Sequence, residues 1–180
     1  MRITGGVHRS RQLKAPKGDR TRPTSDRVRE ALFGILDARG RLADADVLDV
    51  FAGTGALGLE ALSRGARSAT FVEHAPPALA ALRANVASLG EEARCRVIAR
   101  RAHAALPELA EGAFDLVLCD PPWDDVPELS DTLAELARRA RSGGWLIVEH
   151  ARRTPAPSLE GVRLVETRVW GDTAVSFFEV

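Results

Sequence analysis

A glycine-rich turn between two acidic residues is the first feature of the chain that could do chemistry. Gly53, Gly55 and Gly58 follow a short apolar run and precede a helical pattern, which is the order of the dinucleotide-binding fingerprint. Glu73 ends the next apolar run, 20 residues after Gly53, and a carboxylate there can accept hydrogen bonds from a ribose diol. The spacing predicts a site for a cofactor that contains a nucleoside, and NAD and S-adenosylmethionine both fit it.

Asp49 favours S-adenosylmethionine over NAD. It lies four residues before Gly53, where a carboxylate would repel the pyrophosphate of a dinucleotide. The same carboxylate suits a ligand that carries an ammonium group and a sulfonium, as S-adenosylmethionine does. The plain alternative is a tight strand-to-helix turn that binds nothing, and the presence of both Asp49 and Glu73 argues against it.

A second motif, Asp120-Pro121-Pro122-Trp123, ends a later apolar run. The two prolines fix the backbone and remove two amide donors, so the turn would present the Asp120 carboxylate and nearby carbonyls as acceptors. Such acceptors can hold the N–H groups of an exocyclic amine so that its lone pair faces a methyl donor, while Trp123 stacks on the base. We predict these four residues as the catalytic group; a rigid loop before a helix is the alternative.

Alternating strand and helix patterns would bring both motifs to one edge of a sheet. Strand-like apolar runs cover residues 47–51, 69–72, 96–99, 114–119 and 145–148. Helical patterns lie between Asp26 and Gly40 and over residues 56–64, 77–89, 103–110 and 129–141. They predict an α/β fold with a doubly wound, mostly parallel sheet, to which residues 163–170 and 174–180 add a C-terminal antiparallel hairpin. Ligands of such sheets bind at the carboxyl ends of the strands, where the glycine turn, Glu73 and Asp120 would meet.

The basic residues gather at the N-terminus although the net charge of the chain is zero. Residues 1–29 hold nine Lys or Arg and two acidic residues, a formal charge of +7, whereas the remainder holds 16 basic and 23 acidic residues, a charge of −7. A basic arm on an acidic body is a signal of nucleic-acid binding. The candidate RNA-binding residues are Arg2, Arg9, Arg11, Lys14, Lys17, Arg20 and Arg22. A basic tail that is merely solvated is the alternative.

We therefore divide the chain into a basic arm or small hairpin, residues 1–22, and a catalytic domain, residues 23–180. The arm has few apolar residues, mainly Ile3, Val7 and Leu13. We expect it to contribute little to the core, so that its removal spares the fold.

The remaining composition is that of an ordinary globular chain, 45% hydrophobic and 28% charged over 180 residues. The first residues lack the apolar stretch of a secretory signal, and no run approaches the roughly 18 apolar residues of a membrane span, which predicts a cytoplasmic protein. Cys95 and Cys119 lack metal-ligand spacing, so we interpret them as free thiols and expect no metal. His150 is interpreted as a structural histidine rather than a general base, and a monomer is expected.

Four stretches resemble a known family closely. Residues 21–33 (TRPTSDRVREALF), 47–66 (VLDVFAGTGALGLEALSRGA), 148–150 (VEH) and 171–173 (GDT) are similar to the bacterial 16S ribosomal RNA guanine-N2 methyltransferases. The resemblance covers nearly the whole chain. It implies a Rossmann-like methyltransferase fold and methyl transfer from S-adenosylmethionine to the N2 of one guanine in 16S RNA, within a small-subunit particle or assembly intermediate.

The chain departs from that family at two positions. The family usually has an acid followed by alanine after the third strand, where the acid reaches the adenine amino group, but here Arg101 precedes Ala102. An arginine cannot accept that hydrogen bond, so adenine recognition would depend on backbone groups and apolar packing. The family's usual Tyr or Phe is Trp123 here. The expected cofactor contacts are Asp49, Phe51, Gly53, Thr54, Gly55, Glu73, Arg101, Ala102 and Asp120.

Three other functions stay open on sequence alone. An NAD-dependent oxidoreductase is compatible with the glycines but not with Asp49 and the Asp-Pro-Pro-Trp motif. A non-catalytic RNA-binding assembly factor is favoured only by Arg101. The same chemistry could also act on another RNA, such as tRNA, or on a protein glutamine.

Overall fold

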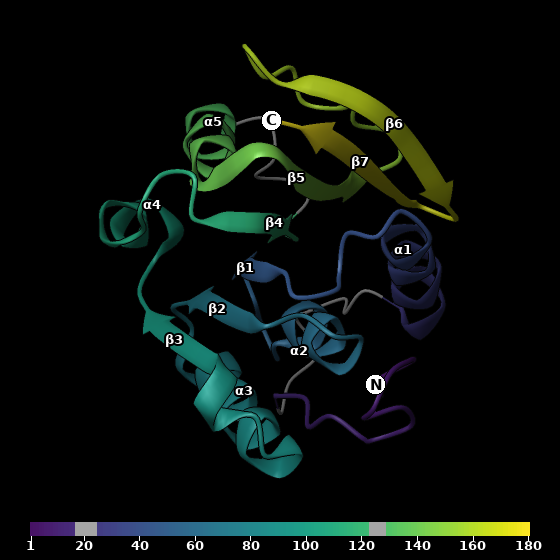
Figure 1. Ribbon diagram of the computed structural model, residues 1–180, viewed down its shortest axis with the longest axis vertical. Helices are drawn as coiled ribbons and strands as arrows, with labels where there is room; N and C mark the ends of the chain where they lie inside the picture. Colours follow the sequence, from purple (N-terminus) through teal and green to yellow (C-terminus); the bar gives the residue numbers. More distant parts are fainter. Residues whose placement is uncertain (17–24, 123–128) are drawn as a thin grey trace.

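The computed structural model describes residues 1–16, 25–122 and 129–180. Within them, seven strands form one sheet in the order β3-β2-β1-β4-β5-β7-β6. Figure 1 shows this order from β3 at the lower left to β6 at the upper right. The strands are β1 (Asp46–Val50), β2 (Ser68–Glu73), β3 (Cys95–Ala99), β4 (Phe114–Cys119), β5 (Ala140–Ala151), β6 (Arg163–Trp170) and β7 (Thr173–Glu179). The first five are mutually parallel, and β7 runs antiparallel to β5 and β6. The predicted fold class, with its C-terminal hairpin, is confirmed.

The helix α1 (Asp26–Ala38) precedes β1. The parallel strands are connected by α2 (Ala56–Ser63), α3 (Pro76–Leu89), α4 (Ala102–Ala105) and α5 (Ser130–Arg139). α1 begins where Ser25 caps it, accepting a hydrogen bond from Val28 N at 3.2 Å, and it buries an apolar stripe that includes Leu32 and Leu36. The side-chain pattern and the cap thus define both the start and the buried face of this helix.

Two predicted boundaries are wrong, for different reasons. The helix expected over 103–110 is a four-residue α4 followed by a 3-10 turn, Leu106–Glu108, because Pro107 has no amide hydrogen for a longer helix. The fifth strand was expected at 145–148 but runs from Ala140 to Ala151. Its pairing with β4 shifts register between Phe114 and Leu116, so the two glycines before Trp145 lie in an irregular part of the strand instead of a turn.

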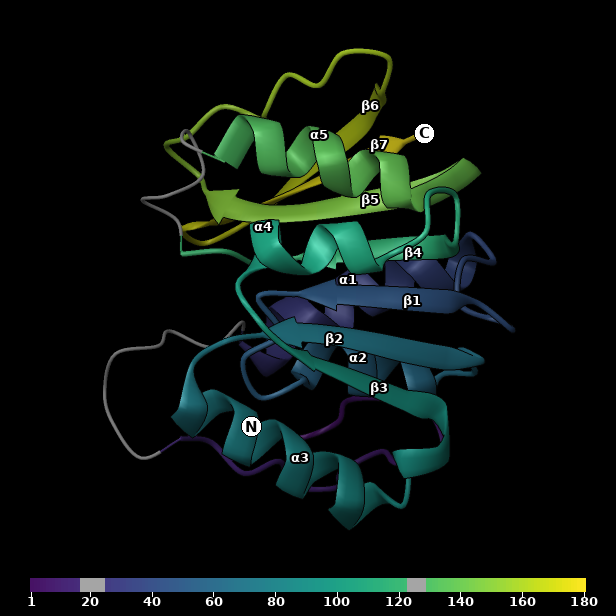
Figure 2. The same cartoon turned by 90° about the vertical axis from the view of Figure 1, so that its left-hand side faces the viewer.

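The two faces of the sheet carry separate apolar cores. One core joins buried residues of α1, α2 and α3, such as Leu36, Leu62 and Leu82, to the sheet. The other joins residues of α4 and α5, such as Ala105 and Leu133. Figure 2 shows α4 and α5 in front of the sheet and α1 and α2 behind it. Both faces are therefore covered, as a parallel sheet requires.

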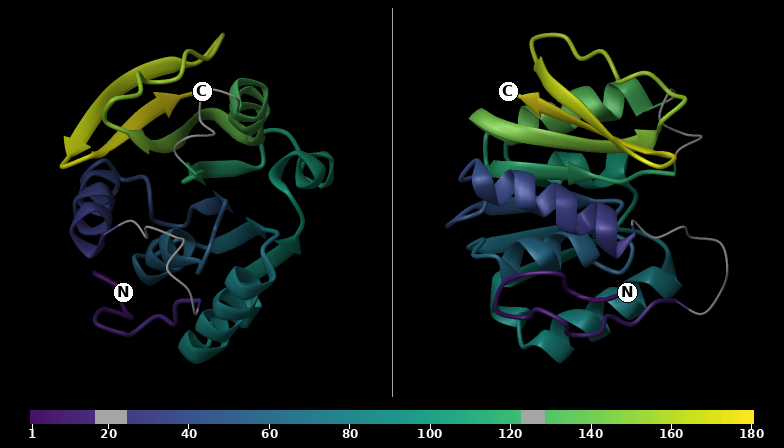
Figure 3. Two further views of the ribbon diagram at one scale, coloured as in Figure 1. Left: turned by 180° about the vertical axis from the view of Figure 1, so that it is seen from behind. Right: turned by 90° about the vertical axis from the view of Figure 1, so that its right-hand side faces the viewer.

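The N-terminal segment is a small hairpin that packs on the body of the protein. Arg2 and Gln12 form an antiparallel bridge, and Figure 3 shows the segment passing beside α2 and α3. Ile3 and Leu13 are buried in the first core, whereas Val7 is 81% exposed. The expectation that this segment adds little to the core is wrong, because Ile3 and Leu13 face inward. No helix among the described residues is long and apolar enough to cross a membrane.

Candidate active site

The turn after β1 uses a backbone conformation that glycine favours. Phe51, Gly53 and Gly55 have φ angles of 61°, 56° and 78°, all in the left-handed region. A Cβ atom on Gly55 would lie 2.3 Å from Leu82 Cδ1, so any other residue would have to displace Leu82 and also adopt a left-handed φ. A bulky residue such as Phe51 adopts this conformation at a cost, which is frequent at functional sites. The turn leads into the first residue of α2 at the carboxyl end of β1.

Glu73 supports this turn from the end of β2. Its Oε2 accepts a hydrogen bond from Gly53 N at 2.9 Å, and its Oε1 accepts from His74 N at 2.7 Å and Ala75 N at 2.8 Å. The side chain is 9% exposed. Three backbone donors fix the carboxylate, which still has lone-pair capacity for a further donor. The geometry pre-organises Glu73 beside the glycine turn.

Asp49 lies one strand away and is less well satisfied. Its Oδ2 accepts a hydrogen bond from Gly58 N at 2.9 Å, but its Oδ1 is buried and has no partner among the described residues. Burial, together with the negative charges of Asp120 and Glu73, raises the pKa of Asp49 from 3.8 to about 7. A buried acceptor without a partner costs free energy, which a cationic or N–H-bearing ligand would recover.

The Asp-Pro-Pro turn follows β4, the strand next to β1. Asp120 N donates to Val50 O at 3.5 Å, a long contact that ties the turn to the end of β1. Pro121 is buried and Pro122 is exposed, and Trp123 lies outside the described residues. Because Asp120 acts electrostatically on Asp49, the structure brings the carboxylates of Asp49, Glu73 and Asp120 to one rim, as expected.

Arg101 and Ala102 mark the end of the same rim after β3. Arg101 is exposed and occupies the N-cap position of α4 without a side-chain capping hydrogen bond, while Ala102 packs partly buried against the second core. Neither side chain offers an acceptor to an adenine amino group, so the departure seen in the sequence persists in the structure.

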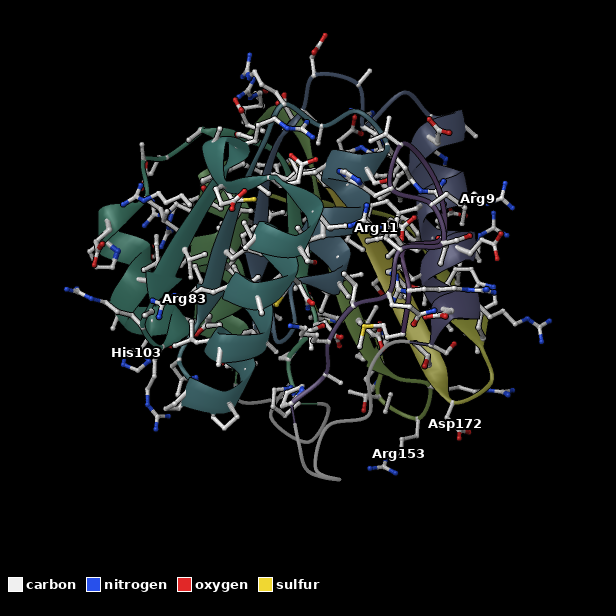
Figure 4. The ribbon with its side chains drawn as sticks, turned by 90° about the horizontal axis from the view of Figure 1, so that it is seen from below. Arg9, Arg11, Arg83, His103, Arg153 and Asp172 are labelled. Carbon is white, nitrogen blue, oxygen red and sulfur yellow. The ribbon has the colours of Figure 1, made fainter. Side chains whose placement is uncertain are left out.

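Of the predicted basic residues, Arg2, Arg9, Arg11 and Lys14 are described and exposed, and Lys17, Arg20 and Arg22 lie outside the described residues. Arg2 forms an ion pair with Asp26 at 3.7 Å, and Arg11 Nη2 donates to Ser88 O at 2.7 Å. Figure 4 shows Arg9 reaching away from the body of the protein.

Other predicted residues have structural surroundings. His150 is 1% exposed, and its ring nitrogens lie 2.8 Å from Ser176 Oγ and 3.1 Å from Ala151 O, which confirms a structural histidine. Cys95 and Cys119 are free cysteines, and burial raises both thiol pKa values, that of Cys95 to about 12. The described residues contain no group of three or more His, Cys, Asp or Glu side chains placed to hold a metal ion.

Sequence reasoning missed Asn85, a fully buried residue of α3. Its amide bonds both to Lys14 in the arm and to Thr54 in the glycine turn. The available signal was its position: it lies on the same helix face as Leu82, Val86 and Leu89, where a polar residue needs a buried partner.

Comparison with known proteins agrees with this geometry. The chain is 34% identical over 185 residues to the putative ribosomal RNA methyltransferase YlbH of Bacillus subtilis, covering 99% of this chain and 98% of that protein. It is 39% identical over 149 residues to ribosomal RNA small subunit methyltransferase D of Escherichia coli K12, covering 83% of this chain and 71% of that protein.

A solved structure is also similar. The putative methyltransferase YhhF of Escherichia coli superposes with a TM-score of 0.83 at 33% identity, covering 99% of this chain and 97% of that one. The family model described as conserved hypothetical protein 95 matches residues 1–179. The resemblance to ribosomal RNA methyltransferases that the sequence indicated is confirmed, and the chain belongs to the family of conserved hypothetical protein 95.

Proposed function

We propose that this protein transfers a methyl group from S-adenosylmethionine to the exocyclic N2 of a guanine in 16S ribosomal RNA. The observation that carries the proposal is the meeting of Asp49, Glu73 and Asp120 at the carboxyl ends of β1, β2 and β4. This rim combines a partly unsatisfied carboxylate for a cation with an Asp-Pro-Pro turn for an amine. The relatives of this chain include proteins named as small-subunit ribosomal RNA methyltransferases.

The residues around the glycine turn fit S-adenosylmethionine, which supplies an electrophilic methyl group on a sulfonium. Asp49 would attract the ammonium group through its free Oδ1, and Glu73 would accept from the ribose hydroxyls. The turn itself would provide the close backbone approach, with contributions from Phe51, Gly53, Thr54 and Gly55. Backbone groups of Arg101 and Ala102 would border the adenine.

The β4 turn would handle the guanine. Asp120 would accept from the N2 amino group and hold it with its lone pair toward the methyl donor, while Pro121 and Pro122 keep the turn rigid. Trp123 would stack on the base. The amine proton can leave after methyl transfer, so no strong general base is needed.

The arm would bind RNA phosphate through Arg2, Arg9, Arg11, Lys14, Lys17, Arg20 and Arg22. The target would be RNA within a small-subunit particle or assembly intermediate, in the cytoplasm. Phosphate contacts orient a nucleic acid without reading its sequence, so selection of one guanine would depend on the shape of the particle and on the rim.

A direct assay tests this function. Purified protein is incubated with radiolabelled S-adenosylmethionine and either naked 16S RNA or small-subunit particles from cells lacking the gene. Label recovered as N2-methylguanosine is the expected result, and comparison of the two substrates identifies the preferred one. In parallel reactions that supply tRNA or cell protein instead, label in tRNA or in a protein glutamine would assign a different substrate. No label in any reaction, with an intact fold, would favour an assembly factor.

A further inference from the structure

One buried amide, that of Asn85, joins the N-terminal arm to the glycine turn. Asn85 Oδ1 accepts from Lys14 N at 2.7 Å, and Nδ2 donates to Lys14 O and Thr54 O, both at 3.0 Å. The side chain has no exposed surface. Both of its N–H groups and its carbonyl are therefore used, and the two segments they join lie about 40 residues apart in the sequence.

The contact reaches a part of the turn that has little freedom. Thr54 stands between Gly53 and Gly55, which both have left-handed φ angles, and Glu73 holds Gly53 N from the other side. A displacement of Lys14 would have to move Thr54 or leave buried polar groups without partners, which is costly. Movements of the arm and of the turn are thus linked through one side chain.

The other end of the arm is hydrogen-bonded to α2, the helix that follows the glycine turn. Glu60 of α2 is fully buried and accepts from Thr4 N at 2.8 Å, Thr4 Oγ1 at 2.7 Å and Gly5 N at 2.8 Å. Arg9 and Arg11, two of the proposed phosphate-binding residues, lie between these two anchors in the sequence. RNA that engages them would pull on a segment that is anchored to α2 at one end and, through Asn85, to the glycine turn at the other.

We infer that Asn85 is a positioning residue that couples RNA binding by the arm to cofactor binding by the glycine turn. The inference rests on the proposed function. RNA that orders the arm would stabilise the turn, so RNA and cofactor would each raise affinity for the other by the same factor, as linkage requires. A substrate-bound enzyme would then retain its cofactor more tightly than the free enzyme does.

A thermodynamic cycle tests the coupling. The Kd of S-adenosylhomocysteine is measured with and without saturating 16S RNA transcript, for the wild type, Asn85→Ala and His8→Ala. His8→Ala is the matched control because His8 ties the arm to Glu91 beyond the end of α3, away from the turn. We expect RNA to tighten cofactor binding at least about fivefold in the wild type and the control, and less than about twofold in Asn85→Ala.

A second measurement needs only the wild type, in case Asn85→Ala does not fold. Hydrogen exchange at the Lys14 amide should slow when S-adenosylhomocysteine binds, and exchange at the Gly53 and Gly55 amides should slow when RNA binds. Full coupling in folded Asn85→Ala, or exchange that responds to neither ligand across the joint, would overturn the inference alone. A wild type that binds neither ligand would overturn the proposed function with it.

Discussion

Carboxylates at the two rims of the sheet differ in their hydrogen-bond partners and in the direction of their pKa shifts, and β1 contains one example of each. Asp46, at the start of β1, accepts from Arg67 Nε at 3.0 Å and Ser68 Oγ at 2.7 Å, and the bond from Arg67 is the largest cause of its lowered pKa. Asp49, three residues later, has one buried oxygen without a partner, and burial raises its pKa to about 7.

The neighbours continue the contrast. On the amino-end rim, Asp115 Oδ1 lies 2.9 Å from Arg141 Nη1, and Arg41, Arg67 and Arg141 line a cavity of about 260 Å³ together with acidic residues. On the carboxyl-end rim, the negative charges of Asp120 and Glu73 contribute to the raised pKa of Asp49. Acidic side chains at the amino-end rim are paired with arginines, whereas Asp49 at the carboxyl-end rim keeps one buried oxygen without a partner among the described residues.

The largest expected effect is on turnover when Asp120 is lost. Asp120→Ala should keep cofactor affinity and lower kcat by about 10²–10³-fold, the range for one pre-organised polar partner of the reacting group. The matched change on the other rim, Asp115→Ala, should leave kcat unchanged and cost about 1 kcal/mol of stability. Methylation rates and thermal unfolding are measured for both variants. Equal losses of kcat in the two variants would contradict a special role of Asp120.

Loss of Glu73 should act on the cofactor instead. In Glu73→Ala the ribose hydroxyls lose a charged acceptor, which should weaken S-adenosylmethionine binding by about 1.5–3 kcal/mol, or roughly 10–150-fold in Kd. Calorimetry measures this. Because Glu73 also accepts from Gly53 N, Glu73→Gln is the control for the turn: one oxygen can still hold Gly53, so its Kd should lie between those of the wild type and Glu73→Ala. Unchanged affinity in a folded Glu73→Ala protein would remove Glu73 from the site.

The pKa of Asp49 should make cofactor affinity depend on pH. With a pKa of about 7, Asp49 is neutral below that pH in the free protein, whereas a cationic ligand prefers the ionised form. Affinity should therefore fall below pH 7, by at most about tenfold per pH unit, and binding at about pH 6 should release up to one proton. Calorimetry in two buffers that differ in ionisation enthalpy counts the proton.

The ionisation of Asp49 and that of Asp46 should change the stability of the fold in opposite directions as the pH changes. The folded-state pKa of Asp49 lies above 3.8, so its ionisation opposes folding, and this cost grows as the pH rises from 3.8 toward 7, by up to about 1.4 kcal/mol per unit. The pKa of Asp46 is lowered, so its favourable contribution is present above pH 3.8 and is lost as the pH falls. Asp49→Asn should raise Tm above pH 7 and abolish the proton release; release that persists would contradict the assignment.

The meeting of Asp49, Glu73 and Asp120 at one rim was predictable from sequence because it follows from the strand pattern; their roles stay predictions. The apolar runs that end at Val50, Glu73 and Cys119 are parallel strands, and their carboxyl ends must meet at one edge. The packing of the arm and the role of Asn85 were not predictable in this way, since both depend on contacts between distant segments. A buried polar residue in an apolar stripe indicates that a partner exists, but not which one.

The smallest expected effect concerns the exposed cations of the arm. Deleting the arm would remove Ile3 and Leu13 from the core, so point substitutions are the better test. Arg9 and Lys14 have exposed side chains, and their replacement by alanine leaves the backbone bonds of Lys14 to Asn85 in place. Each lost phosphate contact should reduce the slope of log K for RNA against log salt by about 0.7–0.9, with cofactor affinity unchanged in the absence of RNA.

The control for this prediction lies on the opposite face of the sheet. Arg138 of α5 is also exposed, and it pairs with Glu135. Arg138→Ala removes one positive charge, half of what the Arg9/Lys14 variant removes, so it should weaken long-range attraction slightly but leave the salt slope unchanged, because Arg138 releases no counterion from bound RNA. Equal slopes for the wild type, the control and the Arg9/Lys14 variant would show that these arm cations do not contact RNA phosphate. A reduced slope in the arm variant alone would locate RNA beside the segment that Asn85 connects to the cofactor turn.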